Sequence, residues 1–189
     1  MSQTMTPVRA TLDDLMRTEG KAELIGGKVV KLMPTGYLSN ILAGLIYFSL
    51  LQMVLRTRRG RVGSDGLGFT VDELPSGRQS FSPDVGYFSQ ATLENPVRFV
   101  NGAPDFAVEV RSENDYGPAA ERAIIAKRAD YFAAGTLVVW DVDPLAQEVR
   151  AYRPNAEPLT FTRGQVADAE PAVPDWSLDV NWLFEEAAR

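Results

Sequence analysis

Residues 105–144 read DFAVEVRSENDYGPAAERAIIAKRADYFAAGTLVVWDVDP, and this stretch decides the fold. It begins with an apolar run at 105–110 that is rich in valine and typical of a buried strand. Good helix formers follow from about 119 to 134, and Gly135 is a residue that commonly ends a helix. A second β-rich run covers 136–143. A strand, a helix and a strand in succession predict a mixed β-sheet covered by helices.

Further strands are expected on both sides of this passage. The run KAELIGGKVVKL at 21–32 predicts a hairpin around Gly26-Gly27, because adjacent glycines adopt the positive φ angles of a tight turn. Short strands at 61–64 and 83–88 precede the central passage. The run EVRAYR at 148–153 follows it, so we expect that run to pair with the strand at its end.

The most apolar window of the chain is 41–55, ILAGLIYFSLLQMVL. It is shorter than the roughly 20 residues that a helix needs to cross a bilayer, so we expect a buried core helix at about 38–57 and no membrane partner. No repeat or linker divides the chain. The expected architecture is therefore a single α/β (α+β) domain over residues 11–189, preceded by a flexible N-terminus at 1–10.

The composition excludes several kinds of chemistry. The chain has 189 residues with no cysteine and no histidine. Ser-His-Asp and Cys-His catalysis, Cys and His zinc sites, thiol redox chemistry and disulfides all require one of these residues. Any reactivity must come from carboxylates, amines, hydroxyls or a bound ion. The first residues lack a basic segment followed by an apolar stretch, so we expect no signal peptide and a cytoplasmic protein.

The net charge disfavours a protein that coats nucleic acid without specificity. The chain carries 19 Lys+Arg against 25 Asp+Glu, a net charge of −6, and phosphate neutralisation by cations supplies that kind of binding. A local basic surface remains compatible with this charge. The candidates for contacting nucleic acid are five arginines: Arg56, Arg58, Arg59, Arg61 and Arg111. For the first four, the alternative is a solvated helix end.

Two charged residues lie in apolar surroundings within the central passage. Glu109 lies inside the first strand, where a carboxylate is costly to bury unless it is paired or bound to a cation. Lys127 comes three residues after Ile124 and four before Tyr131, so it borders the apolar stripe of the helix and could reach the sheet. The plainer alternatives are that Glu109 faces solvent together with Ala107, and that Lys127 lies along the surface.

Asp84 is a third candidate, because it follows Pro83 at the start of a predicted strand. Its alternative is a simple turn residue. Carboxylate oxygens from Asp84 and Glu109 would make a hard site suited to Mg²⁺ or Mn²⁺, which can polarise a phosphodiester and acidify a bound water. Lys127 could then orient that water, accept its proton if burial lowers the pKa of the amine, or neutralise the transition state.

The succession ELIGGKVV, SPDVGYF, PDFAVEVRS and AKRADYFAAGTLVVWDVDP resembles the Uma-two family, a former domain of unknown function in the PD-(D/E)XK superfamily. The resemblance runs from about Thr11 to the end of the chain. It implies a restriction-endonuclease-like mixed sheet flanked by helices and a Mg²⁺- or Mn²⁺-dependent endonuclease that hydrolyses DNA. It also implies catalytic roles for Asp84, Glu109 and Lys127, with Asp84, Glu109 and Glu23 as the metal ligands.

The chain departs from the family pattern at two places. The superfamily usually has a lysine two residues after the motif acid, where this chain has Arg111, a poor general base; Lys127 matches the helix lysine that replaces it in this family. Many members have a histidine near the start of the long helix, where this chain has Ser39-Asn40.

These departures leave two alternatives open. One is a catalytically degenerate protein of the same fold that binds DNA or a protein partner, and the other is a structural domain. If the chain is active, DNA is the expected partner. A homodimer is then expected too, because a two-fold pair of sites cuts both strands most simply.

Overall fold

The computed structural model describes residues 8–90 and 95–189. Positions 1–7 of the predicted flexible N-terminus therefore lie outside the described residues. Ala10, at the end of that predicted segment, is held against the hairpin, because its N–H donates to the Gly27 carbonyl at 2.8 Å.

The predicted strand, helix and strand form the centre of a six-stranded sheet. Strand β8 (Phe106–Val110) runs parallel to β9 (Val138–Asp143), and helix α3 (Pro118–Ala133) connects them. The sheet order is β11-β10-β9-β8-β6-β3. The remaining strands are antiparallel to their neighbours: β3 (Arg61–Ser64), β6 (Val85–Phe88), β10 (Glu148–Tyr152) and β11 (Leu159–Thr162). The prediction of a mixed α/β sheet flanked by helices is confirmed.

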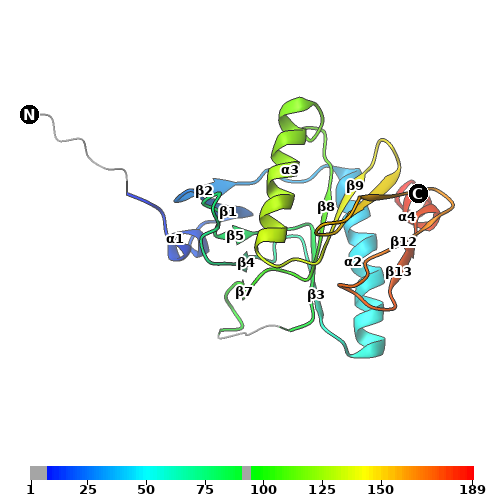
Figure 1. The fold of residues 1–189 in the computed structure, drawn as a ribbon, viewed down its shortest axis with the longest axis horizontal. Helices are drawn as coiled ribbons and strands as arrows, with labels where there is room; N and C mark the ends of the chain where they lie inside the picture. Colours follow the sequence, from blue (N-terminus) through cyan, green and yellow to red (C-terminus); the bar gives the residue numbers. More distant parts are fainter. Residues whose placement is uncertain (1–7, 91–94) are drawn as a thin grey trace, which may run out of the picture.

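Helix α2 (Tyr37–Thr57) covers one face of this sheet, and α3 lies on the opposite side of β8 (Figure 1). The length and apolar composition of α2 would suffice to span a membrane. In this fold, however, Leu42, Ile46 and Leu50 are fully buried and pack with Phe106 and Val108 of β8. Helix α2 is thus the core helix that its sequence predicted.

The face under α3 is covered as well, which overturns one expectation. Ala107 is fully buried there with Val139 and Tyr131. Glu109 points to the same face as Ala107, because side chains two apart in a strand share a face. The alternative in which Ala107 and Glu109 face solvent is therefore wrong, and the carboxylate of Glu109 lies beneath a helix.

The N-terminal part of the chain packs beside α3. Helix α1 (Leu12–Met16) begins at Thr11, whose side chain and that of Asp14 form a capping box. Strands β1 (Ala22–Ile25) and β2 (Lys28–Lys31) form the predicted hairpin, with φ angles of 58° and 70° at the two turn glycines. A small sheet lies next to it, formed by β5 (Ser80–Phe81), β4 (Phe69–Thr70) and β7 (Val100–Asn101).

The chain ends on the α2 side. Strands β12 (Val166–Asp168) and β13 (Ser177–Asp179) lead into helix α4 (Val180–Ala187), which packs against α2. This segment closes the larger core, and its Asp175 lies 3.5 Å from the candidate residue Arg59, whereas Glu109 and Lys127 lie on the α3 side.

Candidate active site

Asp84 is held against β8 by the backbone. It precedes β6 directly, and its N–H donates to the Val108 carbonyl at 3.1 Å. Its Oδ2 accepts the N–H of Val110 at 2.8 Å. Because Val110 follows Glu109, this bond fixes the Asp84 carboxylate beside the strand that carries Glu109. The structure thus assigns Asp84 a fixed position in the sheet, where the alternative was a simple turn residue.

Glu109 has one anchored oxygen. Its Oε1 accepts the Tyr131 hydroxyl at 2.6 Å and lies 2.8 Å from the Lys127 ammonium. Within residues 8–90 and 95–189, no hydrogen bond reaches Oε2. Burial and the nearby carboxylates of Asp84 and Glu23 raise the pKa of Glu109, although Lys127 acts against them. A partly buried carboxylate, 28% exposed and with repelling acidic neighbours, favours a bound cation.

Glu23 is a buried partner of two cations. Its Oε2 pairs with the Arg78 guanidinium, while its Oε1 accepts the Ser82 N–H at 3.0 Å and lies 3.2 Å from Lys127. Burial would raise the pKa of Glu23, but Lys127 and Arg78 outweigh burial and lower it. With both oxygens engaged in this way, Glu23 is suited to position Lys127. The arrangement gives no support to the prediction that Glu23 is a metal ligand.

Lys127 reaches the sheet, as its position on the helix predicted. Burial alone would lower the pKa of Lys127, but the carboxylates of Glu109 and Glu23 outweigh burial and raise it. This direction does not support the hypothesis that Lys127 accepts a proton with a lowered pKa. The residue presents a positive charge at the side of Glu109.

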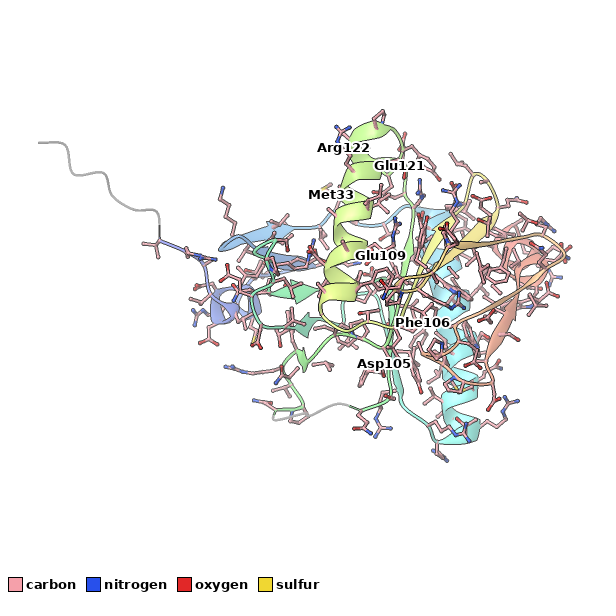
Figure 2. The ribbon with its side chains drawn as sticks, in the orientation of Figure 1. Met33, Asp105, Phe106, Glu109, Glu121 and Arg122 are labelled. Carbon is pink, nitrogen blue, oxygen red and sulfur yellow. The ribbon has the colours of Figure 1, made fainter. Side chains whose placement is uncertain are left out.

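Helix α3 is fixed over the site by charged contacts. Besides Lys127, the Asp130 carboxylate on the same face accepts the Arg78 Nε at 2.8 Å. Figure 2 shows Glu109 beneath this helix, with Glu121 and Arg122 near its N-terminal end. The network joins α3, β1 and the segment before β5, so it holds the acidic side chains in one place.

The donor set fits a hard divalent cation. Asp84 and Glu109 offer carboxylate oxygens, and the described residues contain no group of three or more acidic side chains close enough to enclose an ion. Mg²⁺ suits such an open site, because it keeps several waters and is usually held by one or two carboxylates together with substrate phosphates. Mn²⁺ prefers the same carboxylate and water ligands.

A cavity of about 420 Å³ adjoins the site. It lies between the β1–β2 hairpin, β8 and α3, and its wall includes Glu109, Lys127 and Glu23. Its apolar lining comes from both sides, including Val30 and Leu32 on the hairpin side and Ile124 on α3. A concave site with a few converging charged groups is typical of a binding or catalytic pocket.

The structure does not bring the first arginine cluster to this pocket. Arg61 pairs with Phe88 at one end of β6, whereas Asp84 precedes the other end. That separation spans four strand residues, about 13 Å at the usual rise of a strand. Arg56, Arg58, Arg59 and Arg61 are all exposed near the C-terminal end of α2. Their predicted contact with nucleic acid would therefore lie outside the candidate active site.

Arg111 is not a surface cation. Its side chain is 4% exposed, and its guanidinium binds both carboxylate oxygens of Asp141 at 2.7 Å and pairs with Glu121 on α3. This burial and pairing do not support the prediction that Arg111 contacts nucleic acid, although Arg111 also lines the cavity beside Glu109. The residue instead links β8, β9 and the first turns of α3.

Sequence reasoning missed three residues that contact the acids. Tyr131 lies one turn after Lys127, so the helical spacing could have indicated it. Lys21 directly precedes β1, and its carbonyl accepts the Leu32 N–H at 2.9 Å beside the hairpin. Its Nζ lies 2.9 Å from Oδ1 of Asp84. Arg78 reaches Glu23 only through the tertiary fold, so no local pattern could have indicated it.

Comparisons with known proteins agree with this architecture. A crystal structure of a putative nuclease belonging to DUF820 from Anabaena variabilis ATCC 29413 has a TM-score of 0.73. The match covers 96% of this chain and 99% of that chain at 22% identity, which indicates a shared fold. No significant match was found among curated proteins. The model of the Uma2 family, described as "Putative restriction endonuclease", matches residues 9–181. The chain therefore belongs to the Uma2 family, named above as the Uma-two family.

Proposed function

We propose that this protein is a metal-dependent endonuclease that hydrolyses phosphodiester bonds in DNA. One observation carries the proposal: Asp84, directly before β6, is fixed against the strand that carries Glu109, and the Lys127 ammonium lies 2.8 Å from Glu109. Two carboxylates beside a permanent cation suit a reaction in which a phosphate gains negative charge. Membership of the Uma2 family supports the same reaction class.

Each residue has a distinct role in this mechanism. Asp84 and Glu109 would hold the Mg²⁺ or Mn²⁺, which would supply an acidified water and polarise the phosphodiester. Lys127 remains protonated and stabilises the negative charge that develops on the phosphate. Tyr131 keeps Glu109 in position through its hydroxyl, and Glu23 does the same for Lys127.

Cleavage of supercoiled plasmid and linear duplex DNA tests the proposal. Wild type should nick or cut DNA with Mg²⁺ or Mn²⁺ and should be inactive in EDTA. Asp84→Asn keeps the size of the side chain and removes its charge, so it should abolish cleavage. Asp72→Asn removes an exposed carboxylate and serves as the matched control. If no divalent ion supports cutting by wild type above the Asp84→Asn background, the enzymatic proposal is wrong.

A second candidate is a degenerate member of the fold that binds DNA or a protein without cutting. The buried Arg111 in place of the usual lysine and the net charge of −6 favour it. Calorimetry with Mg²⁺ and Mn²⁺ separates the two candidates. Saturable binding of one ion that is lost in Asp84→Asn supports the nuclease, whereas no measurable affinity supports the degenerate alternative.

For cleavage of both strands, we propose that the active form is a homodimer. A two-fold axis would present two copies of the site to the two antiparallel strands of a duplex. Light scattering on the purified protein gives the mass directly. A dimer that converts plasmid to linear product in one binding event supports this proposal, and a monomer that produces only nicked circles contradicts it.

A further inference from the structure

Lys21 lies between two carboxylates at the edge of the candidate metal site. Its Nζ is 2.9 Å from Oδ1 of Asp84 and 2.6 Å from Oδ1 of Asp65. The Lys21 side chain is 17% exposed and that of Asp65 is 36% exposed. Asp65 follows β3 directly, in a turn closed by a hydrogen bond from Leu67 to the Ser64 carbonyl. The ammonium therefore has one partner inside the site and another at its rim.

Lys21 contacts Oδ1 of Asp84, while Oδ2 accepts the backbone N–H of Val110. A carboxylate oxygen that already accepts a hydrogen bond has less capacity left for a cation. Oδ1 is thus the oxygen that a metal ion would use more readily, and the Lys21 ammonium lies there. A divalent ion bound by Asp84 must compete with this ammonium, and the two positive charges repel each other at short range.

Asp65 is a second ion-pair partner for Lys21. If Lys21 moves away from Asp84, its partly buried charge needs another partner, because an unpaired buried charge is costly. Asp65 already contacts the ammonium, so only a small displacement is required. A lysine held by Asp84 alone would be harder to displace.

We propose that Lys21 is a resident counter-ion of Asp84 that is displaced when a divalent metal binds, and that Asp65 receives it. This inference rests on the metal site of the proposed function and adds a regulation of its affinity. Lys21 and Asp65 are positioning residues that act through Asp84. The proposal predicts opposite effects from removing the two side chains.

Titration of Mn²⁺ into each protein, followed by calorimetry or by the electron paramagnetic resonance of free Mn²⁺, measures this affinity without turnover. Lys21→Met keeps the aliphatic stem and removes the competing charge, so it should tighten Mn²⁺ binding about tenfold or more. Asp65→Asn should weaken binding several-fold, because Lys21 then has only Asp84. Asp72→Asn is the control for the loss of one negative charge.

The double variant separates displacement from a general effect of charge. If Asp65 acts through Lys21, Asp65→Asn should change the affinity by less than about twofold in the Lys21→Met background, since coupled residues show large interaction energies in such a cycle. An equal effect in both backgrounds, or an unchanged affinity in Lys21→Met, overturns the proposal. If Lys21→Met fails to fold, an Asp65→Asn affinity equal to that of Asp72→Asn overturns it as well.

The outcomes also distinguish this inference from the proposed function. Wild type that binds Mn²⁺ and cuts DNA, with no change in Lys21→Met, refutes the displacement alone. If Lys21→Met binds Mn²⁺ more tightly than wild type and wild type does not cleave DNA, the displacement is supported and the nuclease proposal is refuted. An absence of binding in both wild type and Lys21→Met overturns both.

Discussion

The Lys127 ammonium lies 2.8 Å from Oε1 of Glu109, so α3 and β8 meet through an ion pair at the centre of the candidate site. Of the residues of α3, all of which the structure describes, Tyr131 is the only one fully buried. The helix is therefore held over the sheet by charged contacts in addition to the apolar packing of Tyr131 and Phe132. The same contacts position the groups that we assign to catalysis, which couples the packing of α3 to the chemistry.

Two replacements of Lys127 distinguish a role of its positive charge in catalysis from a role in proton transfer. Lys127→Met should reduce Mn²⁺-supported cleavage by about 100-fold or more, because it removes the cation that stabilises the transition state. Lys127→Arg keeps the charge and cannot act as a base, so it should retain part of the activity. Cleavage rates at saturating metal are the measurement. Equal loss in both variants would indicate that the amine transfers a proton.

Tyr131→Phe should affect activity through the position of Glu109. The variant loses the 2.6 Å bond to Glu109, which should lower the free energy of unfolding by about 1 kcal/mol and slow cleavage. Tyr116→Phe is the matched control, because its hydroxyl donates to Asp143 at 2.9 Å. It should lose similar stability in urea denaturation with no change in rate. Equal rates for the two variants would refute the positioning role.

Glu23 should make stability depend on pH. Its pKa is lower in the folded protein than the ordinary value of 4.5. Its stabilisation is thus complete above about pH 4.5 and is lost as the pH falls further. Glu23→Gln should lower the free energy of unfolding by about 3 kcal/mol at pH 7. The difference from wild type should shrink below pH 4.5 in urea denaturation, and a difference that grows there would contradict the assignment.

Arg111 should matter for stability. Arg111→Met leaves Asp141 buried without its partner and should cost about 3–5 kcal/mol of unfolding free energy. Arg122→Met, on the exposed side of α3, should change the same quantity by less than about 0.5 kcal/mol. Chemical denaturation of both variants tests this. A stable Arg111→Met protein with weakened DNA binding would restore the earlier assignment of Arg111 to nucleic acid.

The sequence predicted the elements whose signals are local. The strand, helix and strand around α3, the glycine hairpin and the core helix α2 follow from periodicity and turn chemistry. The position of Lys127 on the inner face of α3 follows from helical spacing.

The partners of these residues could not be predicted in the same way. Lys21 and Arg78 meet Asp84 and Glu23 only because distant segments pack side by side. Whether an arginine such as Arg111 is exposed likewise depends on which strands and helices enclose it.

The pKa of Lys127 shows the same limit. Its place beside an apolar stripe left open that burial lowers the pKa of Lys127. The two carboxylates that raise this pKa lie on strands β1 and β8, far from Lys127 in the sequence. The sign of a pKa shift depends on tertiary charge contacts, which a residue pattern does not contain.

The anomalous scattering of a crystal soaked in Mn²⁺ tests the central claim most directly, because it locates the metal relative to Asp84 and Glu109. The account predicts one anomalous peak about 2.0–2.3 Å from a carboxylate oxygen of each residue. Lys127 should remain beside Glu109. A fully soaked crystal with no peak between these two carboxylates, or with its peak at other residues, would contradict the account.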